Sequence, residues 1–209
     1  MKTAILIPTY VSVDALLFGQ FIFLAQWATQ QNIPIITVAN RTHNDARNWL
    51  ATGGGGFENS NQLIEQVDQL VWIDSDQVFK VEQLQTLIEC EEKFCSGWYV
   101  KETTPMVARW DEDFFVENSH MDFLSIEELE DAKELLQVDY CGFGFTKTHT
   151  DILKKMEYPF FRNKLIDIHI YKENASEDVS FCLDAYEATG IKPMVLPELR
   201  VGHCKSMVI

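Results

Sequence analysis

Short apolar runs separated by amphipathic stretches fill the first third of the chain. The runs stop at turn residues and have the length of strands buried on both faces, which is typical of a parallel sheet. The pattern predicts strands at residues 3–8, 34–39 and 70–73, and helices at 15–30, 44–50 and 61–70. Asp14 can cap the first of these helices. This alternation is the order of a doubly wound α/β fold.

Beyond residue 76 the same criteria predict further helices and strands around a less regular middle. We expect helices at residues 81–92, 125–136, 148–156 and 177–189, and strands at 94–100, 138–146 and 192–196. A capping box begins at Ser125, and the last helix has Ser176 before it and Gly190 after it. No linker divides the chain, so we predict a single domain over residues 1–209.

Composition narrows the classes of partner. The chain has 209 residues, 46% of them hydrophobic, and a net charge of −15, which fits a globular protein and opposes binding to nucleic acid or anionic membrane. A phosphate-bearing ligand would need a local basic group or a divalent metal.

No apolar run reaches the ~18 residues of a membrane span. The five cysteines are odd in number and lack C-x-x-C spacing. We therefore expect reduced thiols and a soluble, cytoplasmic protein, with the oligomeric state left open.

The clearest candidate for chemistry is the hexapeptide VWIDSD at residues 71–76. Asp74 and Asp76 follow a predicted buried strand, at the edge where α/β sheets bind ligands. If the backbone stays extended through Ser75, both carboxylates reach one site, and oxygen ligands of this kind suit a hard divalent cation. The same triplet also fits an ordinary acidic turn.

Three other segments contain candidate residues for a functional site. Glu177 and Asp178 fall in the first turn of a helix, where the dipole favours the ionised form that a general base needs, although acids also serve there as caps. His203 follows a late strand and can bind a metal or lie on the surface. Lys205 can face a diphosphate. The two glycines in residues 138–145 indicate a close approach to the backbone, by a ligand or by a packed aromatic ring.

The order of these segments resembles that of GT-A glycosyltransferases that use nucleotide sugars, in particular the inverting family two type. The resemblance covers most of the chain. It rests on Ile7-Pro8-Thr9-Tyr10, Asp45-Ala46-Arg47-Asn48, Trp72-Ile73-Asp74-Ser75-Asp76, Ser96-Gly97-Trp98-Tyr99, Cys141-Gly142-Phe143-Gly144-Phe145, Glu177-Asp178 and Gly202-His203. It implies one GT-A domain with a doubly wound, mostly parallel sheet between helices and a small antiparallel sheet on the acceptor side. The nucleotide-binding half would span about residues 1–100 and the acceptor-side half about 101–209.

The resemblance also implies a donor site and a metal site. The donor would be a nucleotide sugar, with UDP as the expected nucleotide. Its contacts would be Pro8, Tyr10, Arg47, Asp74, Ser75 and Lys205. Mn²⁺ or Mg²⁺ would be held by Asp76 and His203, with Asp74 reaching the metal, the ribose or the sugar.

On the acceptor side, the resemblance makes Asp178 the base that deprotonates a hydroxyl of a glycan or another acceptor, with Glu177 as the alternative. Attack on the opposite face of the anomeric carbon would invert its configuration. The sugar would lie near Trp98, Tyr99, Trp110, Gly142 and Phe143, with core packing as the alternative role for the aromatic rings. The chain is short for the family, so acceptor recognition is expected from residues 109–118 and the acidic helix after Ser125.

Three alternatives remain. Residues 70–78 (LVWIDSDQV) also fit the first motif of haloacid dehalogenase-type phosphatases, with Asp74 as nucleophile and Asp76 as acid/base. That motif usually opens its fold, whereas two predicted strands precede it here. A nucleotidyltransferase should carry a Gly-rich loop with an Arg after the first strand, where residues 8–12 stand instead; the glycines at 53–56 follow no strand directly and predict a turn. The third alternative is a nucleotide-sugar-binding module without activity, which turnover would separate from an enzyme.

Overall fold

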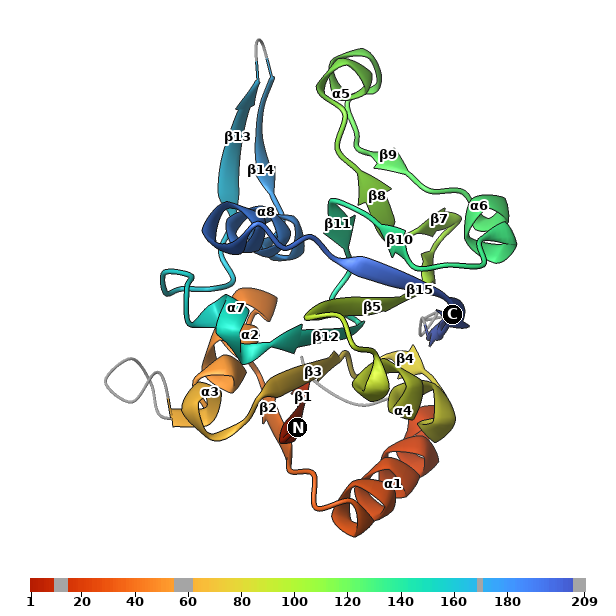
Figure 1. Ribbon diagram of the computed structural model, residues 1–209, viewed down its shortest axis with the longest axis vertical. Helices are drawn as coiled ribbons and strands as arrows, with labels where there is room; N and C mark the ends of the chain where they lie inside the picture. Colours follow the sequence, from red (N-terminus) through yellow and green to blue (C-terminus); the bar gives the residue numbers. More distant parts are fainter. Residues whose placement is uncertain (10–14, 55–61, 169–170, 205–209) are drawn as a thin grey trace.

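A seven-stranded sheet forms the centre of the computed structural model, which describes residues 1–9, 15–54, 62–168 and 171–204 (Figure 1). From one edge to the other, its strands are β10 (Leu136–Gln137), β15 (Met194–Arg200), β5 (Phe94–Trp98), β12 (Phe145–His149), β3 (Gln69–Ile73), β1 (Thr3–Thr9) and β2 (Ile35–Ala39). All strands except β12 and β10 run in the same direction. The predicted α/β class with a mostly parallel sheet is therefore confirmed.

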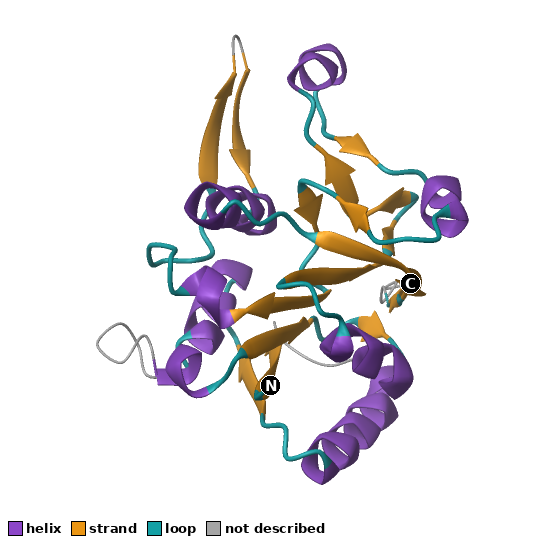
Figure 2. Cartoon of the chain, viewed as in Figure 1, coloured by secondary structure: helices purple, strands orange, loops and turns teal. Residues whose placement is uncertain are grey.

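Alternate residues of the strands pack under helices on opposite faces of the sheet. In β1, Ala4 and Leu6 belong to one apolar cluster, and Ile5 and Ile7 belong to another. The first cluster is covered by α2 (His43–Ala51), α3 (Gln62–Gln66), α7 (Thr150–Leu153) and α8 (Glu177–Thr189), and the second by α1 (Ala15–Gln30) and α4 (Val81–Glu89) (Figure 2). Burial on both faces explains why these strands are continuously apolar. None of the described helices is long and apolar enough to cross a membrane.

Two arms project from the same side of the molecule (Figure 1). One is the antiparallel hairpin of β13 (Lys164–Ile168) and β14 (Tyr171–Ala175). The other carries α5 (Glu112–Asn118) between β8 (Val107–Arg109) and β9 (Asp122–Phe123), which form a three-stranded antiparallel sheet with β11 (Tyr140–Cys141). The remaining short elements are α6 (Ile126–Asp131) and two strand pairs, β4 (Gln77–Val78) with β16 (Gly202–His203) and β6 (Val100–Lys101) with β7 (Thr104–Pro105).

Several predicted boundaries were wrong. The third helix ends at Gln66, because the backbone N–H groups of Asp68 and Gln69 both donate to the carbonyl of Lys2 and turn the chain into β3. The acidic helix ends at Asp131, and residues 136–137 pair with β15. The expected helix at 148–156 is reduced to α7, and the expected strand at 138–146 is divided between β11 and β12. By contrast, α8 has the predicted bounds, with Gly190 in the left-handed conformation at its end.

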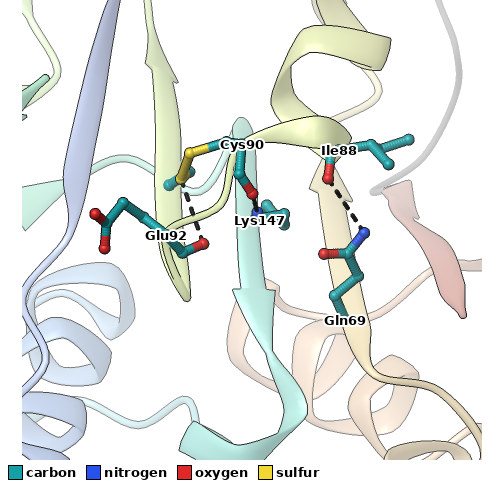
Figure 3. The surroundings of a disulfide bond; sticks show 6 residues. Gln69, Ile88, Cys90, Glu92 and Lys147 are labelled. Carbon is teal, nitrogen blue, oxygen red and sulfur yellow. Dashed lines mark hydrogen bonds between the residues drawn. A yellow bond between two sulfur atoms is a disulfide. The ribbon is translucent and has the colours of Figure 1, made fainter. Parts of the chain in front are cut away.

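A disulfide joins Cys90 and Cys95, which corrects the expectation that the cysteines are reduced thiols (Figure 3). Cys90 ends α4 and Cys95 lies in β5, so the tight turn between the two elements brings the cysteines together. On the neighbouring strand β12, the Lys147 ammonium donates to the Cys90 carbonyl. Lys147 is 1% exposed, and this burial lowers its pKa to about 8.

Lys147 should make the stability of the fold depend on pH in the alkaline range. An unfolded lysine has a pKa of about 10.4. Between pH 8 and pH 10 the unfolded state therefore binds more protons than the folded state, and the free energy of unfolding rises with pH. We expect Lys147→Met to remove a rise of about 3 kcal/mol, measured by urea unfolding between pH 7.5 and 10.5. Lys93→Met, at an exposed lysine nearby, is the matched control and should keep the slope of the wild type. An unchanged slope in Lys147→Met would contradict this account.

Candidate functional site

Asp74 and Asp76 lie on a tight turn at the end of β3. The backbone N–H of Gln77 donates to the carbonyl of Asp74 at 3.1 Å, and the N–H of Asp74 donates to the carbonyl of Gly144 at 3.0 Å. The backbone therefore turns at Ser75. This differs from the extended conformation considered in the sequence analysis. The turn nevertheless directs both carboxylates into the same two cavities.

Arg47 on α2 joins Asp74 to the start of α8. Its guanidinium donates to Glu177 at 2.7 Å, to Asp178 at 2.6 Å and to both oxygens of Asp74 at 3.0 and 3.1 Å. Only 2% of Arg47 is exposed. Its donor geometry suits several carboxylates at once. One buried cation thus fixes three elements, α2, the β3 turn and α8, around a common centre.

Burial and charge have opposite effects on the groups in this cluster. Burial raises the pKa of Asp178 to about 6, although the charge of Arg47 lowers it. Burial works against the charge on Arg47, but the carboxylates of Asp178, Asp74 and Glu177 outweigh it and raise its pKa. One oxygen of Asp178 also accepts the backbone N–H of Phe143 at 3.3 Å. Asp178 is therefore held in place, ionised at neutral pH and more basic than an ordinary carboxylate.

The pairing of β4 with β16 brings His203 to Asp76. His203 lies opposite Gln77 in this pair, and its Nε2 is 3.1 Å from Oδ2 of Asp76. The Tyr99 ring stacks on the imidazole with a centroid separation of 5.6 Å. The second carboxylate oxygen of Asp76 is buried and has no hydrogen-bond partner among the described residues. Burial, followed by the charge of Asp74, raises the pKa of Asp76, and His203 opposes the shift.

Two adjoining cavities share these residues. The larger has a volume of about 430 Å³ and contains the Arg47 cluster, the Asp76–His203 pair and Tyr99 in its walls. The smaller has a volume of about 200 Å³ and is lined by Pro8, Thr9, Arg41 and Ser75 among others. His43, Asp74 and Asp76 line both cavities. A molecule with two ends can therefore occupy both cavities across one junction.

The donor atoms in the site fit a divalent cation that also binds substrate. Within the described residues, no group of three or more His, Cys, Asp or Glu side chains is placed to hold a metal. Asp76 and His203 offer one carboxylate and one imidazole, and the unpartnered oxygen of Asp76 is the kind of buried atom that a cation satisfies. Mg²⁺ is commonly bound by one or two carboxylates together with substrate phosphates. Asp74 is occupied by Arg47, so it is the weaker candidate ligand.

Some residues expected to contact the sugar pack inside the protein instead. Trp98 is 1% exposed and donates its indole N–H to the carbonyl of Pro197, while Phe143 is 0% exposed within an aromatic cluster. Gly142 gives room to Tyr99, because a Cβ at position 142 would lie 2.3 Å from the Tyr99 hydroxyl. The close approach predicted from the glycines is therefore that of an aromatic ring. Tyr99 does line the larger cavity, and Trp110 is half-buried against Phe115.

The other expected residues divide into two groups. Pro8, Ser75, Glu177 and Asp178 line the cavities, while Tyr10 and Lys205 lie outside the described residues. Sequence reasoning missed further wall residues, namely Arg41, His43, Lys101, Met106, Tyr140 and Ser176. For His43 there was a usable signal, because it precedes Arg47 by four residues and so shares its face of α2.

Comparisons with known proteins give a fold but no family. No family model matches this chain, and no similar protein is found among curated proteins. Among solved structures, the crystal structure of A197 from STIV is similar, with a TM-score of 0.60 over 99% of this chain and 87% of that one. The two sequences are 20% identical, so the similarity shows a shared fold and nothing about activity.

Removal of Arg47 should destabilise the fold strongly. Arg47→Met leaves Asp74, Glu177 and Asp178 close together without their cation, which typically costs about 3–5 kcal/mol for a buried pair. Urea unfolding at pH 7 measures the loss. Arg109→Met is the matched control, because its ion pair with Glu128 is exposed and should contribute under about 1 kcal/mol. Similar losses in the two variants would contradict a central role for Arg47.

Proposed function

We propose that the protein is a metal-dependent glycosyltransferase with a GT-A fold. It moves a sugar from a nucleoside diphosphate sugar, with UDP as the expected nucleotide, to a hydroxyl group of a glycan or another acceptor, with inversion. The observation that carries the proposal is the shared cavity: Asp178, fixed by Arg47, faces the same space as the Asp76–His203 pair. The mixed α/β fold agrees with it. The cytoplasmic location was expected from reduced thiols, and the Cys90–Cys95 disulfide removes that support.

The charge of the larger cavity supports the need for a cation. Among the described residues, four carboxylates line it, from Asp74, Asp76, Glu177 and Asp178. Against them stand Arg47, which is already paired with three of these acids, and Lys101, so acidic groups outnumber basic ones. A diphosphate cannot enter such a space without compensating charge. Asp76 and His203 would hold the Mn²⁺ or Mg²⁺, which supplies Lewis-acid stabilisation of the leaving diphosphate.

Asp178 is the group suited to deprotonate the acceptor. In the transfer, the acceptor oxygen bonds to the anomeric carbon, and its proton passes to the Asp178 carboxylate. The bond between that carbon and the phosphate oxygen breaks, and its electron pair leaves with the nucleoside diphosphate. The pKa of about 6 leaves Asp178 ionised at pH 7 and makes it a better proton acceptor than an ordinary carboxylate. Arg47 and the N–H of Phe143 hold its orientation.

The phosphatase alternative is less well supported by the geometry. A nucleophilic Asp74 would need an oxygen directed at phosphorus, but both of its oxygens accept from the buried Arg47 guanidinium. In Asp178 one oxygen accepts from Arg47, and the other accepts the uncharged N–H of Phe143 at 3.3 Å. Asp76 pairs with His203, whereas an acid/base role would direct it at the leaving group. A binding module without activity would have the same cavities. An assay of sugar transfer distinguishes it from an enzyme.

Asp178→Asn should keep donor binding and lose transfer. The amide has the same size but cannot accept the acceptor proton, and removal of a general base typically costs about 10²–10⁴ in rate. Release of UDP from UDP-sugars with a panel of hydroxyl acceptors measures transfer, and calorimetry with UDP and Mn²⁺ measures binding. Glu177→Gln is the matched control and should keep most of the rate. Loss of binding together with rate would contradict the assigned role, and loss of rate only in Glu177→Gln would move the base to Glu177.

Asp76→Asn should abolish the metal-dependent part of nucleotide binding. A ligand at about 100 times its dissociation constant adds about 2.7 kcal/mol, which for a chain of this size raises the Tm by several degrees. We expect such a shift for the wild type with one of UDP, GDP, CMP or dTDP, only when Mn²⁺ is present. The Asp76→Asn variant should show no metal-dependent shift. Asp131→Asn, at the end of α6, should behave like the wild type. A full shift in Asp76→Asn would place the metal elsewhere.

A further inference from the structure

We infer that His43 binds the diphosphate of the donor at the junction between the two cavities. The inference rests on the proposed function and adds a substrate contact to it. Of the residues that the structure describes, His43, Asp74 and Asp76 line both cavities. A nucleoside diphosphate sugar has its nucleoside at one end and its sugar at the other. When the two ends occupy the two cavities, the diphosphate must cross at these three residues.

Hydrogen-bonding chemistry singles out His43 at this junction. Asp74 and Asp76 repel a phosphate, whereas an imidazole donates an N–H to a phosphate oxygen. The nearest arginine on the same helix, Arg47, has its charge committed to three carboxylates. Among the described side chains that line both cavities, His43 is therefore the one that offers an N–H donor to a diphosphate.

The fold fixes His43 at the start of a firmly held helix. Thr42 caps α2: its hydroxyl accepts the N–H of Asp45, and its carbonyl accepts the N–H of Ala46 at 2.8 Å. One turn further on, Arg47 anchors the same face of α2 to the β3 turn and to α8. The positive end of the helix dipole adds to the attraction for an anion. Binding there would hold the donor with its anomeric carbon towards Asp178.

His43 keeps its proton during transfer. The electron pair of the broken carbon–oxygen bond passes to the phosphate oxygen, the proton of the acceptor passes to Asp178, and the His43 N–H donates to the diphosphate before and after the reaction. Its contribution is to bind and orient the phosphates. Loss of His43 should therefore weaken the binding of nucleoside diphosphates and leave the binding of the nucleoside unchanged.

The test compares uridine, UMP and UDP by calorimetry in the presence of Mn²⁺. His43→Ala should weaken UDP binding about ten- to a hundredfold, since this is the usual contribution of a hydrogen bond to a charged group, and should leave uridine binding unchanged. UMP should lose less than UDP. His43→Gln retains an N–H donor and should recover part of the affinity. His149→Asn is the matched control, because His149 caps α7 at the opposite end of the sheet and Asn keeps that cap.

The outcomes separate this inference from the proposed function. If the wild type binds UDP and His43→Ala binds it equally well, His43 is not a diphosphate contact, and the glycosyltransferase proposal is untouched. Equal losses for uridine and UDP would also overturn the inference, because His43 would then act on the nucleoside or on the fold. If the wild type binds neither UDP nor GDP, CMP or dTDP with the metal, the proposed function fails and His43 loses its ligand with it.

Discussion

The arrangement of the site depends on one buried arginine. Arg47 lies between two carboxylates at the start of α8 and one at the end of β3, and these partners are 27 to 131 residues away in the chain. Without that cation, three acids would repel one another in a space with little water. Removal of the acids would in turn leave a buried guanidinium. The cluster is thus both a constraint on the fold and the device that orients Asp178.

As a consequence, the guanidinium of Arg47 already forms ion pairs with three carboxylates of the protein. The cavity presents carboxylates to a substrate that is itself negative, in a chain of net charge −15. The described cavity walls also contain Arg41 and Lys101, and the account adds a metal at Asp76 and His203 and an N–H donor from His43 at the cavity junction. The same burial that makes Arg47 necessary also raises the pKa of Asp178, so that stability and basicity have a common physical origin.

The sequence was informative where local burial and capping decide the structure. Strands β1 and β3 follow directly from apolar runs, and α8 follows from Ser176 and Gly190. Carboxylates adjacent in sequence were also recognised. The division of residues 138–146 into two strands was not predictable, since β11 pairs with β8 in the small sheet whereas β12 pairs with β3 and β5 in the central sheet. The partners of Arg47 and the burial of Trp98 likewise depend on contacts between distant segments. The hairpin of β13 and β14 did carry a sequence signal, because Ile166, Asp167 and Ile168 alternate between apolar and polar as half-buried strands do.

The central claim is that one donor spans both cavities, with its metal between Asp76 and His203. A crystal structure of the protein with UDP and Mn²⁺ tests it most directly. The account predicts the nucleoside in the cavity lined by Pro8 and Ser75, the diphosphate at the junction, and the metal bound by Asp76 and His203. A nucleotide bound away from these cavities, or a metal without Asp76 among its ligands, would contradict the account.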